Sequence, residues 1–524
     1  MSPPRFASAA QGVILNAVKN LLFPGVTNSR FFARLRMTEG RSPGMSSACV
    51  FDVIVVGGGM AGCAAAVSSA RLGCRTLLVE QFGFLGGWAT AALVNPFMTH
   101  CASDGTPLVA GLFDEIRSRL SEMGGLLGNS FDSECMKFVL QEMTLEAGVR
   151  LRLHSIFKRA RFADDGSIRV ELDSKSGTRH SEQREESRGP EILRAAQNDK
   201  RTQTGTQEFT CRRLIDCSGD GDAAVSLGAA FEMGDKDGLH QATTLMFDMG
   251  GVDLVRTMTY VRDHPDQMRF PKLPPDADPH QLAQGIISVA GYYDLIAEAR
   301  SRGEYGAPGD LIFYIGRPAR GEVVFNTTHI GHIDGTNAED LTRAEIEGRR
   351  QMMSIVAFVR RYVPGFEEAY LLRSAAHVGV RETRRIIGDY VFSAEDVVRA
   401  RKFPDSICRL AYPVDVHSGE GEGYIKDEER KSNESVSGAP PPGDWYEIPC
   451  RCLFPKGIEN VLVAGRCVSS TQAGQGAIRI MPACVAMGQA AGTAAALSVQ
   501  HGVSPRVLSI DALLEALKEQ GASI

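Results

Sequence analysis

The glycine spacing between residues 57 and 62 constrains the fold of this chain more than any other feature of its sequence. Residues 53–56 are all β-branched, which is typical of a strand buried on both faces, and Gly57, Gly59 and Gly62 follow them at G-x-G-x-x-G spacing. In such a turn the first glycine permits the tight bend, the second leaves room for a pyrophosphate, and the third lets a helix lie close to the strand. The pattern predicts a dinucleotide-binding βαβ unit.

A small-residue helix and a second strand complete this unit. The helix is predicted from about residue 61 to residue 72, with Gly73 just beyond its end. Free N–H groups at its start, at Met60 and Ala61, would face the phosphates of the ligand. The second strand ends at Glu80, whose carboxylate can accept hydrogen bonds from both hydroxyls of an adenosine ribose. Because this carboxylate would repel a 2′-phosphate, the sequence disfavours NADP.

Residues further along the chain favour FAD over NAD as the dinucleotide. Gly86 and Gly87 form a second glycine pair, followed by Thr90, where the backbone can approach the middle of an extended cofactor. Gly219 and Asp220 follow a predicted strand and resemble the A-T-G-D strand and turn of flavoproteins. That strand would return the chain to the first sheet after an excursion.

The C-terminal segment is predicted to close the same cofactor site. Gly465 and Arg466 follow a predicted strand, and Gly476 and Arg479 precede a helix that is predicted to begin at Pro482, a residue suited to a first helical turn. The N-terminus of a helix carries about half a positive charge. Directed at the N1–C2=O edge of a flavin, it would stabilise the anionic reduced form and favour hydride acceptance at N5. The alternative is a small-residue helix that packs on a sheet with or without flavin.

At these residues the chain resembles a family, the FAD-dependent oxidoreductases whose flavin module also occurs in the flavin-binding component of heterodisulfide reductase. More distantly it resembles fumarate reductase flavoproteins. The resemblance covers roughly residues 51–520 without the insert described below, and it includes the segments 377–389, 412–417 and 448–456. It implies bound FAD and an α/β fold, in which a glutathione-reductase-like Rossmann domain binds FAD and carries an inserted α+β substrate domain. The cysteine clusters that hold the iron–sulfur centres of that heterodisulfide reductase component are absent from this sequence.

The length of 524 residues predicts more than one lobe, because single cores tend to stop growing at roughly 250–300 residues. We predict an atypical leader (1–44), three parts of an FAD-binding domain (45–173, 208–235 and 446–524), an insert (174–207) and a substrate domain (236–445). The substrate domain lacks a second G-x-G-x-x-G, so no separate NAD(P)H domain is expected. It should contain a helix over residues 342–362. Residues 418–444 are interpreted as a hydrophilic loop, and a cover over the site is the less favoured alternative.

The predicted leader and insert both look foreign to the rest of the chain. The leader has basic residues and no acidic residue before Glu39, a composition that also fits a mitochondrial transit peptide. The insert has no aromatic residue and resembles a disordered segment. Residues 35–38 and 196–199 can be encoded by one nucleotide string read in adjacent frames. We therefore interpret both segments as translated copies of a mobile DNA repeat, which makes Met45 a candidate start.

Titratable residues near the flavin segments are the catalytic candidates. His377 and Arg381 are four residues apart and would share a face of a helix, where Arg381 could bind a carboxylate or carbonyl and His377 could move a proton. Asp415 and His417 are two apart and would share a face of an extended segment, as an acid/base pair beside N5. The alternative for each pair is a structural salt bridge or loop cap. Weaker candidates are His100, Cys101 and Arg384.

Net charge and cysteine content limit the classes of partner that we expect for the protein. The net charge of -6 gives no basic footprint for nucleic acid, and no apolar run reaches the roughly 20 residues that span a membrane. The 12 cysteines are scattered without a C-x-x-C pair, so a reduced, cytoplasmic protein without a metal site is expected. Cys450 and Cys452 are the two cysteines closest in sequence, and a redox-active pair formed by them is a minor alternative. We expect a small-molecule substrate and an external electron donor or acceptor, and leave a homo-oligomer open.

The predicted function is that of an FAD-dependent oxidoreductase that transfers a hydride between a small organic substrate and flavin N5. Two alternatives belong to other classes. One is an electron-transfer flavoprotein that works as part of a larger complex, against which the missing cysteine clusters weigh. The other is a non-redox flavoprotein, whose flavin would never change its redox state during turnover.

Overall fold

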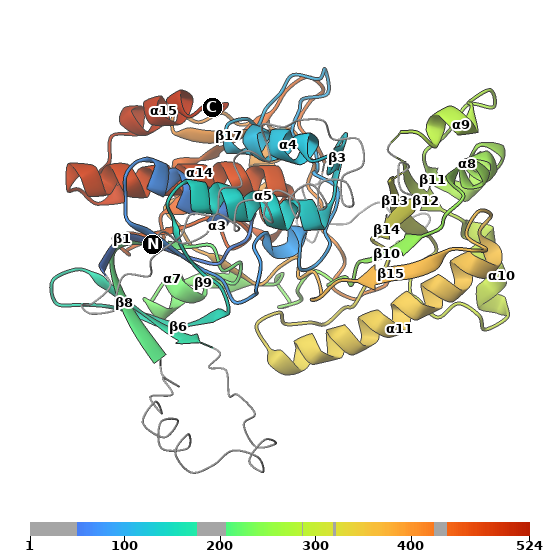
Figure 1. Ribbon diagram of the computed structural model, residues 1–524, viewed down its shortest axis with the longest axis horizontal. Helices are drawn as coiled ribbons and strands as arrows, with labels where there is room; N and C mark the ends of the chain where they lie inside the picture. Colours follow the sequence, from blue (N-terminus) through green and yellow to red (C-terminus); the bar gives the residue numbers. More distant parts are fainter. Residues whose placement is uncertain (1–49, 175–205, 286, 318–320, 424–437) are drawn as a thin grey trace, which may run out of the picture.

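Two lobes, each built on one sheet, make up the described part of the protein (Figure 1). The computed structural model describes residues 50–174, 206–285, 287–317, 321–423 and 438–524. The predicted leader and nearly all of the predicted insert therefore lie outside the described residues. The FAD-site motifs fall in the first lobe, at the left of Figure 1, and the second lobe holds residues from the predicted substrate domain.

A mixed sheet of seven strands, counted over the described residues, forms the centre of the first lobe. Its order is β5-β2-β1-β8-β7-β6, and β19 also pairs with β8. Strands β5, β2, β1, β8 and β19 are parallel, whereas β7 and β6 continue from the first half of β8 as antiparallel neighbours. The parallel part is a Rossmann-type arrangement. The bounds are β1 Val50–Val56, β2 Thr76–Val79, β5 Arg150–Arg152, β6 Ser155–Phe162, β7 Ile168–Ser174, β8 Thr206–Asp216 and β19 Val461–Val463.

Helices cover this sheet, and the two that were predicted beside the cofactor are both present. The helices of this lobe are α3 Met60–Arg71, α4 Leu112–Glu122, α5 Ser133–Glu146, α7 Asp222–Ser226, α12 Ala394–Val398, α13 Gln472–Ile478, α14 Met481–His501 and α15 Ile510–Glu519. Short 3₁₀ turns are η1 Gly87–Ala89, η4 Cys450–Leu453 and η5 Pro505–Val507. By length and composition α14 could cross a membrane, but 89% of its apolar window is buried inside the protein, as in a core helix.

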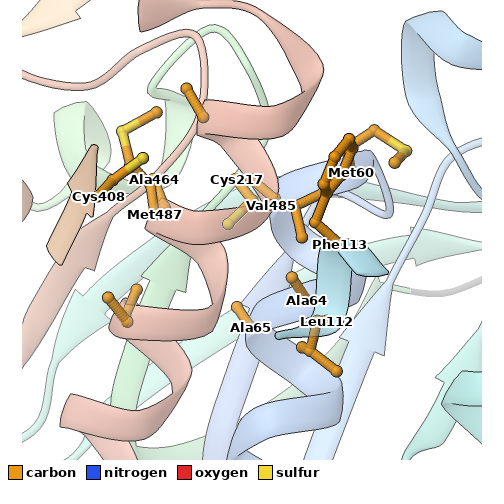
Figure 2. Close-up of a cluster of buried hydrophobic side chains, with 14 of the residues drawn as sticks. Met60, Ala64, Ala65, Leu112, Phe113, Cys217, Cys408, Ala464, Val485 and Met487 are labelled. Carbon is orange, nitrogen blue, oxygen red and sulfur yellow. The ribbon is translucent and has the colours of Figure 1, made fainter. Parts of the chain in front are cut away.

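Helices α3 and α14 pack against each other unusually closely. A Cβ added to Gly488 would lie 2.1 Å from the backbone oxygen of Ala61, and one added to Gly492 would lie 2.2 Å from that of Ala65. Because both contacts advance by four residues, the two helices run in the same direction. Figure 2 shows Ala65 and Val485 among the small and apolar side chains between them. The N-termini of both helices therefore lie at the same end of the lobe.

An antiparallel sheet of six strands, counted over the described residues, supports the second lobe. Its order is β11-β12-β13-β14-β10-β15, with bounds β10 Phe247–Gly250, β11 Met268–Phe270, β12 Ser288–Gly291, β13 Ile312–Arg317, β14 Glu322–Phe325 and β15 Tyr370–Ser374. Its helices are α8 Leu254–Asp263, η2 Pro265–Gln267, α9 Pro279–Leu282, α10 Tyr293–Ser301 and α11 Ala338–Tyr362. The helix predicted over residues 342–362 lies within α11, whose N-cap residue is Asn337. Buried residues of α11 share an apolar cluster with the strands.

The predicted substrate domain, residues 236–445, contributes to both lobes. Its part up to β15 builds the second sheet, whereas buried residues from Phe392 to Tyr412 belong to the apolar cluster that surrounds α3 and α14. Three small strand pairs complete the fold: β3 Leu126–Leu127 with β4 Ser130–Phe131, β9 Phe231–Met233 with β16 Arg384–Ile386, and β17 Ser406–Leu410 with β18 Tyr446–Pro449. The predicted domain boundaries stay predictions.

Candidate active site

One large cavity of about 610 Å³ runs along the first lobe and reaches the second sheet. Most residues that were predicted to bind the cofactor line it: Gly57, Gly59, Met60, Ala61, Glu80, Gly86, Gly87, Gly219, Asp220, Gly465, Arg466 and Arg479. Of the predicted catalytic residues, Arg381, Asp415 and His417 line it as well. Four cofactor candidates (Gly62, Thr90, Gly476 and Pro482) and the catalytic candidate His377 are not among the lining residues. The individual roles of all these residues stay predictions.

The three glycines of the first turn differ in what surrounds them. Gly57 has a φ of +97°, and a Cβ there would lie 2.3 Å from the backbone oxygen of Cys217. A Cβ on Gly62 would lie 1.7 Å from the oxygen of Gly57, so this glycine lets α3 approach the strand. At Gly59, by contrast, a Cβ would meet only the Cα of Gly87, at 3.9 Å. Gly57 and Gly62 are therefore required by the fold, whereas Gly59 faces open space that suits a pyrophosphate.

The second glycine pair lies directly against the first turn. The backbone N–H of Gly86 donates to the oxygen of Gly58 at 2.8 Å, and Gly86 and Gly59 form an isolated β-bridge. The hydroxyl of Thr90 donates to the backbone oxygen of Leu85 at 2.8 Å. Thr90 thus supports the turn that carries Gly86 and does not itself line the cavity.

Glu80 lies immediately after β2, where the sequence places it, and is 5% exposed. Its Oε2 accepts a hydrogen bond from the N–H of Gly58 at 2.7 Å, and its Oε1 accepts one from the N–H of Phe82 at 2.8 Å. Burial raises the pKa of Glu80, and these backbone donors counteract the rise. Both oxygens keep lone pairs that can accept the hydroxyls of a ribose.

Two uncapped helix N-termini face the cavity. Neither Gly59, before α3, nor Ile480, before α14, makes a side-chain cap hydrogen bond, and Met60 and Met481 both line the cavity. The first N–H groups of each helix are thus available to an anionic or electron-rich ligand. The phosphates and the flavin of FAD are such groups, so the backbone of this chain fits the cofactor at both helix ends.

Arg466 joins three cavity-lining segments. Its Nη2 contacts Oδ1 of Asp220 at 2.6 Å, and its Nη1 donates to the backbone oxygen of Val380 at 2.6 Å. The guanidinium also lies 5.5 Å from the centre of the Trp88 ring, within the range of a cation–π contact. Two predicted cofactor residues, Arg466 and Asp220, are thus partners of each other.

His377 and Arg381 would share a face only in a helix, and the segment between β15 and β16 is not helical. His377 Nδ1 lies 2.7 Å from the oxygen of Val378, and its ring stacks on Trp88 at 4.9 Å between centroids. Arg381 is 6% exposed, lines the cavity and donates from Nη1 to the backbone oxygen of Ala242. Only Arg381 of this pair is therefore in contact with the cavity.

Two weaker candidates each have a side-chain partner of their own. Arg384 donates to the carboxylate of Asp222 at 2.6 Å, and Asp222 lines the cavity. His100 Nε2 lies 2.7 Å from Arg117 Nη1. Neither Arg384, His100 nor Cys101 is among the residues that line the cavity.

Asp415 and His417 lie close together, as the extended-segment interpretation predicts. His417 Nε2 is 3.7 Å from Asp415 Oδ2, and the two side chains are 9% and 12% exposed. Burial, together with the nearby positive charge of Arg381, lowers the pKa of His417 to about 3, although Asp415 opposes this shift. His417 is therefore neutral near pH 7 and can accept a proton.

Tyr412 and Arg479 hold the Asp415 carboxylate from two further directions. The Tyr412 hydroxyl donates to Asp415 Oδ2 at 2.8 Å, and Arg479 Nη2 lies 3.8 Å from the same oxygen while donating to the Asp415 backbone oxygen at 3.0 Å. Gly476 belongs to this contact, since a Cβ there would lie 2.7 Å from the Asp415 backbone oxygen. Sequence reasoning missed Tyr412, although it precedes Asp415 by three residues in a segment that the family resemblance includes.

A buried glutamine pair connects the segments that carry Arg381 and His417. Gln241 Nε2 donates to Gln475 Oε1 at 3.1 Å, and both side chains are almost fully buried. Gln241 Oε1 accepts the backbone N–H of His417 at 3.2 Å, while Gln475 Nε2 donates to the backbone oxygen of Arg381 at 3.0 Å. Sequence reasoning missed both glutamines. The only available signal was the position of Gln475 between Gly474 and Gly476.

The cysteine pair considered for redox chemistry is buried in a 3₁₀ turn. Cys450 is 2% exposed and Cys452 is fully buried, and every cysteine among the described residues is free. Burial raises the pKa of both thiols, which disfavours the reactive thiolate. The geometry gives no support to the redox-pair alternative.

Comparison with known proteins identifies the family. The sequence profile of a family described as FAD dependent oxidoreductase matches residues 52–517, so this chain belongs to that family. FAD is its cofactor, and the protein is an FAD-dependent enzyme. The match spans both lobes and all the residues that line the cavity.

Curated relatives resemble only a minor part of the chain. A tRNA uridine 5-carboxymethylaminomethyl modification enzyme from Heliobacterium modesticaldum is 37% identical over 92 residues, which are 17% of this chain and 12% of that protein. The enzyme of the same name from Flavobacterium psychrophilum is 34% identical over 123 residues, which are 23% of this chain and 17% of that protein. The matched segment is thus less than a fifth of either relative's length.

The solved structures that match the chain are distant in sequence. A geranylgeranyl bacteriochlorophyll reductase-like protein from Thermoplasma acidophilum is 11% identical with a TM-score of 0.41, and the match covers 90% of this chain and 84% of that one. A p-nitrophenol 4-monooxygenase from Pseudomonas putida is 12% identical with a TM-score of 0.41, covering 90% and 87%.

Proposed function

We propose that the protein transfers a hydride between a small organic substrate that bears a carboxylate or carbonyl group and N5 of its FAD. One observation carries this proposal. The cavity that is lined by the FAD-site glycines and by the start of α14 is also lined by Arg381, Asp415 and His417. A guanidinium for anchoring and a neutral imidazole for proton transfer thus share a cavity with the cofactor segments. When bound, FAD supplies hydride acceptance at N5.

Arg381 is proposed to anchor the substrate. Its guanidinium is buried, and in such a low-dielectric site a charge-assisted hydrogen bond to a carboxylate is stronger than at the surface. Gln475 fixes the backbone of Arg381 and so limits the positions that the guanidinium can take. Arg381 would therefore orient the substrate as well as bind it.

His417 is proposed to accept the proton that leaves the substrate hydroxyl or carbon. Its low pKa keeps the imidazole neutral, and the imidazolium that forms on protonation would be stabilised by Asp415, whose Oδ2 is 3.7 Å from Nε2. Tyr412 and Arg479 hold that carboxylate in place. In the opposite direction the same imidazolium would return the proton.

The cofactor residues have a consistent set of proposed tasks. Glu80 would bind the adenosine ribose, Gly59 would admit the pyrophosphate, and the N-terminus of α14 would face the flavin edge. We extend this proposal to a glutathione-reductase-like FAD-binding domain, to an external electron donor or acceptor, and to a cytoplasmic location, which suits the free cysteines.

Anaerobic mixing of the FAD-loaded protein with hydroxy- and oxo-carboxylates tests the proposal. Bleaching of the flavin absorbance by at least one hydroxycarboxylate, with one oxo product per flavin reduced, is the expected result. We expect Arg381→Lys to raise the substrate concentration for half-maximal bleaching at least tenfold, since lysine cannot form the bidentate contact. The matched variant Arg360→Lys, whose arginine is exposed on α11 and does not line the cavity, should change it less than twofold.

Flavin that stays oxidised with every carboxylate and carbonyl compound tested would contradict the proposal. Equal effects of the two arginine variants would contradict the role of Arg381 while leaving hydride transfer in place.

A further inference from the structure

A row of side chains crosses the second sheet and lines the same cavity. Strand register places Phe270 of β11 opposite Ala290, and Ala290 opposite Phe313 of β13. The N–H of Asn326 donates to the oxygen of Phe313 at 3.0 Å, and the pairing of β10 with β14 continues the row to Met246. Phe270, Phe313, Asn326 and Met246 all line the cavity. They therefore form one strip across the sheet, which we call the apolar strip.

The apolar strip leads from the proposed anchor to the solvent. At its inner end Met246 is 1% exposed, whereas Phe270 at the outer end, on the edge strand, is 39% exposed. The inner end adjoins Arg381, because Thr244 and Gly379 exchange backbone hydrogen bonds of 3.1 and 2.7 Å. Four strand spacings of about 4.8 Å give the strip a length of roughly 19 Å.

The chemistry of the strip changes along this length. The buried guanidinium of Arg381 lies beside the inner end of the strip. The Asn326 amide belongs to this end as well, and its Oδ1 lies 3.4 Å from the Thr244 hydroxyl. Its outer part is formed by the Phe270 and Phe313 rings, which meet edge to face at 5.5 Å between centroids. A ligand that is complementary along the whole strip is anionic at one end and apolar over the rest.

We infer that the substrate is an amphiphilic carboxylate, with its head at Arg381 and an extended aliphatic tail along the apolar strip towards Phe270. This inference rests on the proposed function and narrows its substrate class. The tail would bury the exposed faces of Phe313 and Phe270, so each added methylene contributes to affinity as far as the strip extends. Short carboxylates would occupy only the inner end.

Calorimetric titration of the FAD-loaded protein with straight-chain carboxylates, from butanoate to octadecanoate, tests this inference without turnover. We expect the affinity to rise about fourfold per methylene until the tail passes Phe270, and then to level off. The corresponding primary alcohols should show the same rise from a weaker starting affinity, because they lack the charge that Arg381 binds. An affinity that does not depend on chain length would overturn the inference.

Two variants locate the tail along the strip. Phe313→Ser should lower the affinity from intermediate chain lengths upward, whereas Phe270→Ser should lower it only for the longest chains. Phe162→Ser is the matched control, because Phe162 is 45% exposed on β6 and does not line the cavity. Equal losses at every chain length in both strip variants would also overturn the inference.

The outcome distinguishes this inference from the proposed function. A chain-length dependence without any flavin reduction would support the strip and contradict hydride transfer from this class. Flavin reduction by short carboxylates without any chain-length dependence of the affinity would support hydride transfer and contradict binding of a tail along the strip.

Discussion

Burial favours the neutral form of two cavity residues, Glu80 and His417, but the neighbouring groups counteract this effect to different degrees. The pKa of Glu80 is raised by burial, but two backbone N–H groups donate to its oxygens and favour the carboxylate. The pKa of His417 is lowered by burial and by Arg381, and the opposing effect of Asp415 is too weak to restore it. The first residue is suited to hold hydroxyl groups, and the second stays a neutral imidazole near pH 7.

The low pKa of His417 makes the stability of the protein depend on pH. An unfolded histidine binds a proton below about pH 6.5, whereas the folded His417 does not until about pH 3. The unfolded state thus binds more protons in this window, and stability falls as the pH falls through it. We expect His417→Asn to remove this decrease in stability at low pH. Between pH 7 and pH 5 the free energy of unfolding of the wild type should fall by about 2 kcal/mol more than that of the variant.

Urea unfolding of both FAD-loaded proteins at the two pH values measures this difference. His264→Asn is a suitable control, because His264 is exposed. Parallel pH dependence of the wild type and His417→Asn would mean that His417 titrates normally in the folded protein.

At the residue scale, the sequence located groups whose roles depend on local spacing. Gly59 and Glu80 lie where the glycine motif and the end of the second strand predict, since a turn and its flanking strands are set by neighbouring residues. The Gln241–Gln475 pair spans 234 residues, and no spacing rule connects such partners. The four-residue spacing of His377 and Arg381 brings two side chains together only in a helix, and this segment is not helical.

At the scale of elements, the close contact between α3 and α14 aligns two helix N-termini at one cavity. Gly488 and Gly492 allow α14 to touch the backbone of α3, which a longer side chain would prevent. The dipoles of both helices are consequently directed at the cofactor segments. The small residues of these helices thus serve the site as well as the packing.

Gly488→Ala should separate these two helices. Its new Cβ would lie 2.1 Å from the backbone oxygen of Ala61, so α14 must shift at a cost of about 1–3 kcal/mol or more. We expect a lower melting temperature and a weaker affinity for FAD, both measured on the same preparation. Gly306→Ala is the matched control, since its Cβ would meet only the Ser354 hydroxyl, at 3.7 Å. A Gly488→Ala protein with wild-type stability would show that the helices are not in this contact.

Element types were more predictable than their arrangement. The β-branched run within β1, the small-residue pattern of α14 and the helix within α11 each follow from local patterns. The pairing of β19 with β8 and the strand order of the second sheet depend on contacts far apart in the sequence. Local patterns do not show which of these strands pair. The C-terminal closure of the site was predicted from the motif that contains Gly465 and Gly476, together with the family resemblance.

At the scale of the whole molecule, the proposed function depends on two lobes that share one cavity. The first lobe contributes the FAD-site segments, and the second contributes the apolar strip beside Arg381. The chain length predicted separate lobes, but it did not predict which surface of each lobe lines the shared cavity. The position of FAD in this cavity is therefore the claim on which the proposed roles of both lobes depend.

Flavin content of Gly59→Val is the measurement that tests this position most directly. A Cβ at Gly59 meets only the Cα of Gly87 at 3.9 Å, and its φ is -71°, so the protein should tolerate a side chain there. The same side chain would occupy the space assigned to the pyrophosphate. We expect the wild type to contain one FAD per chain, and Gly59→Val to be folded by circular dichroism but free of flavin. A folded Gly59→Val protein that keeps its full complement of FAD would contradict this position of the cofactor.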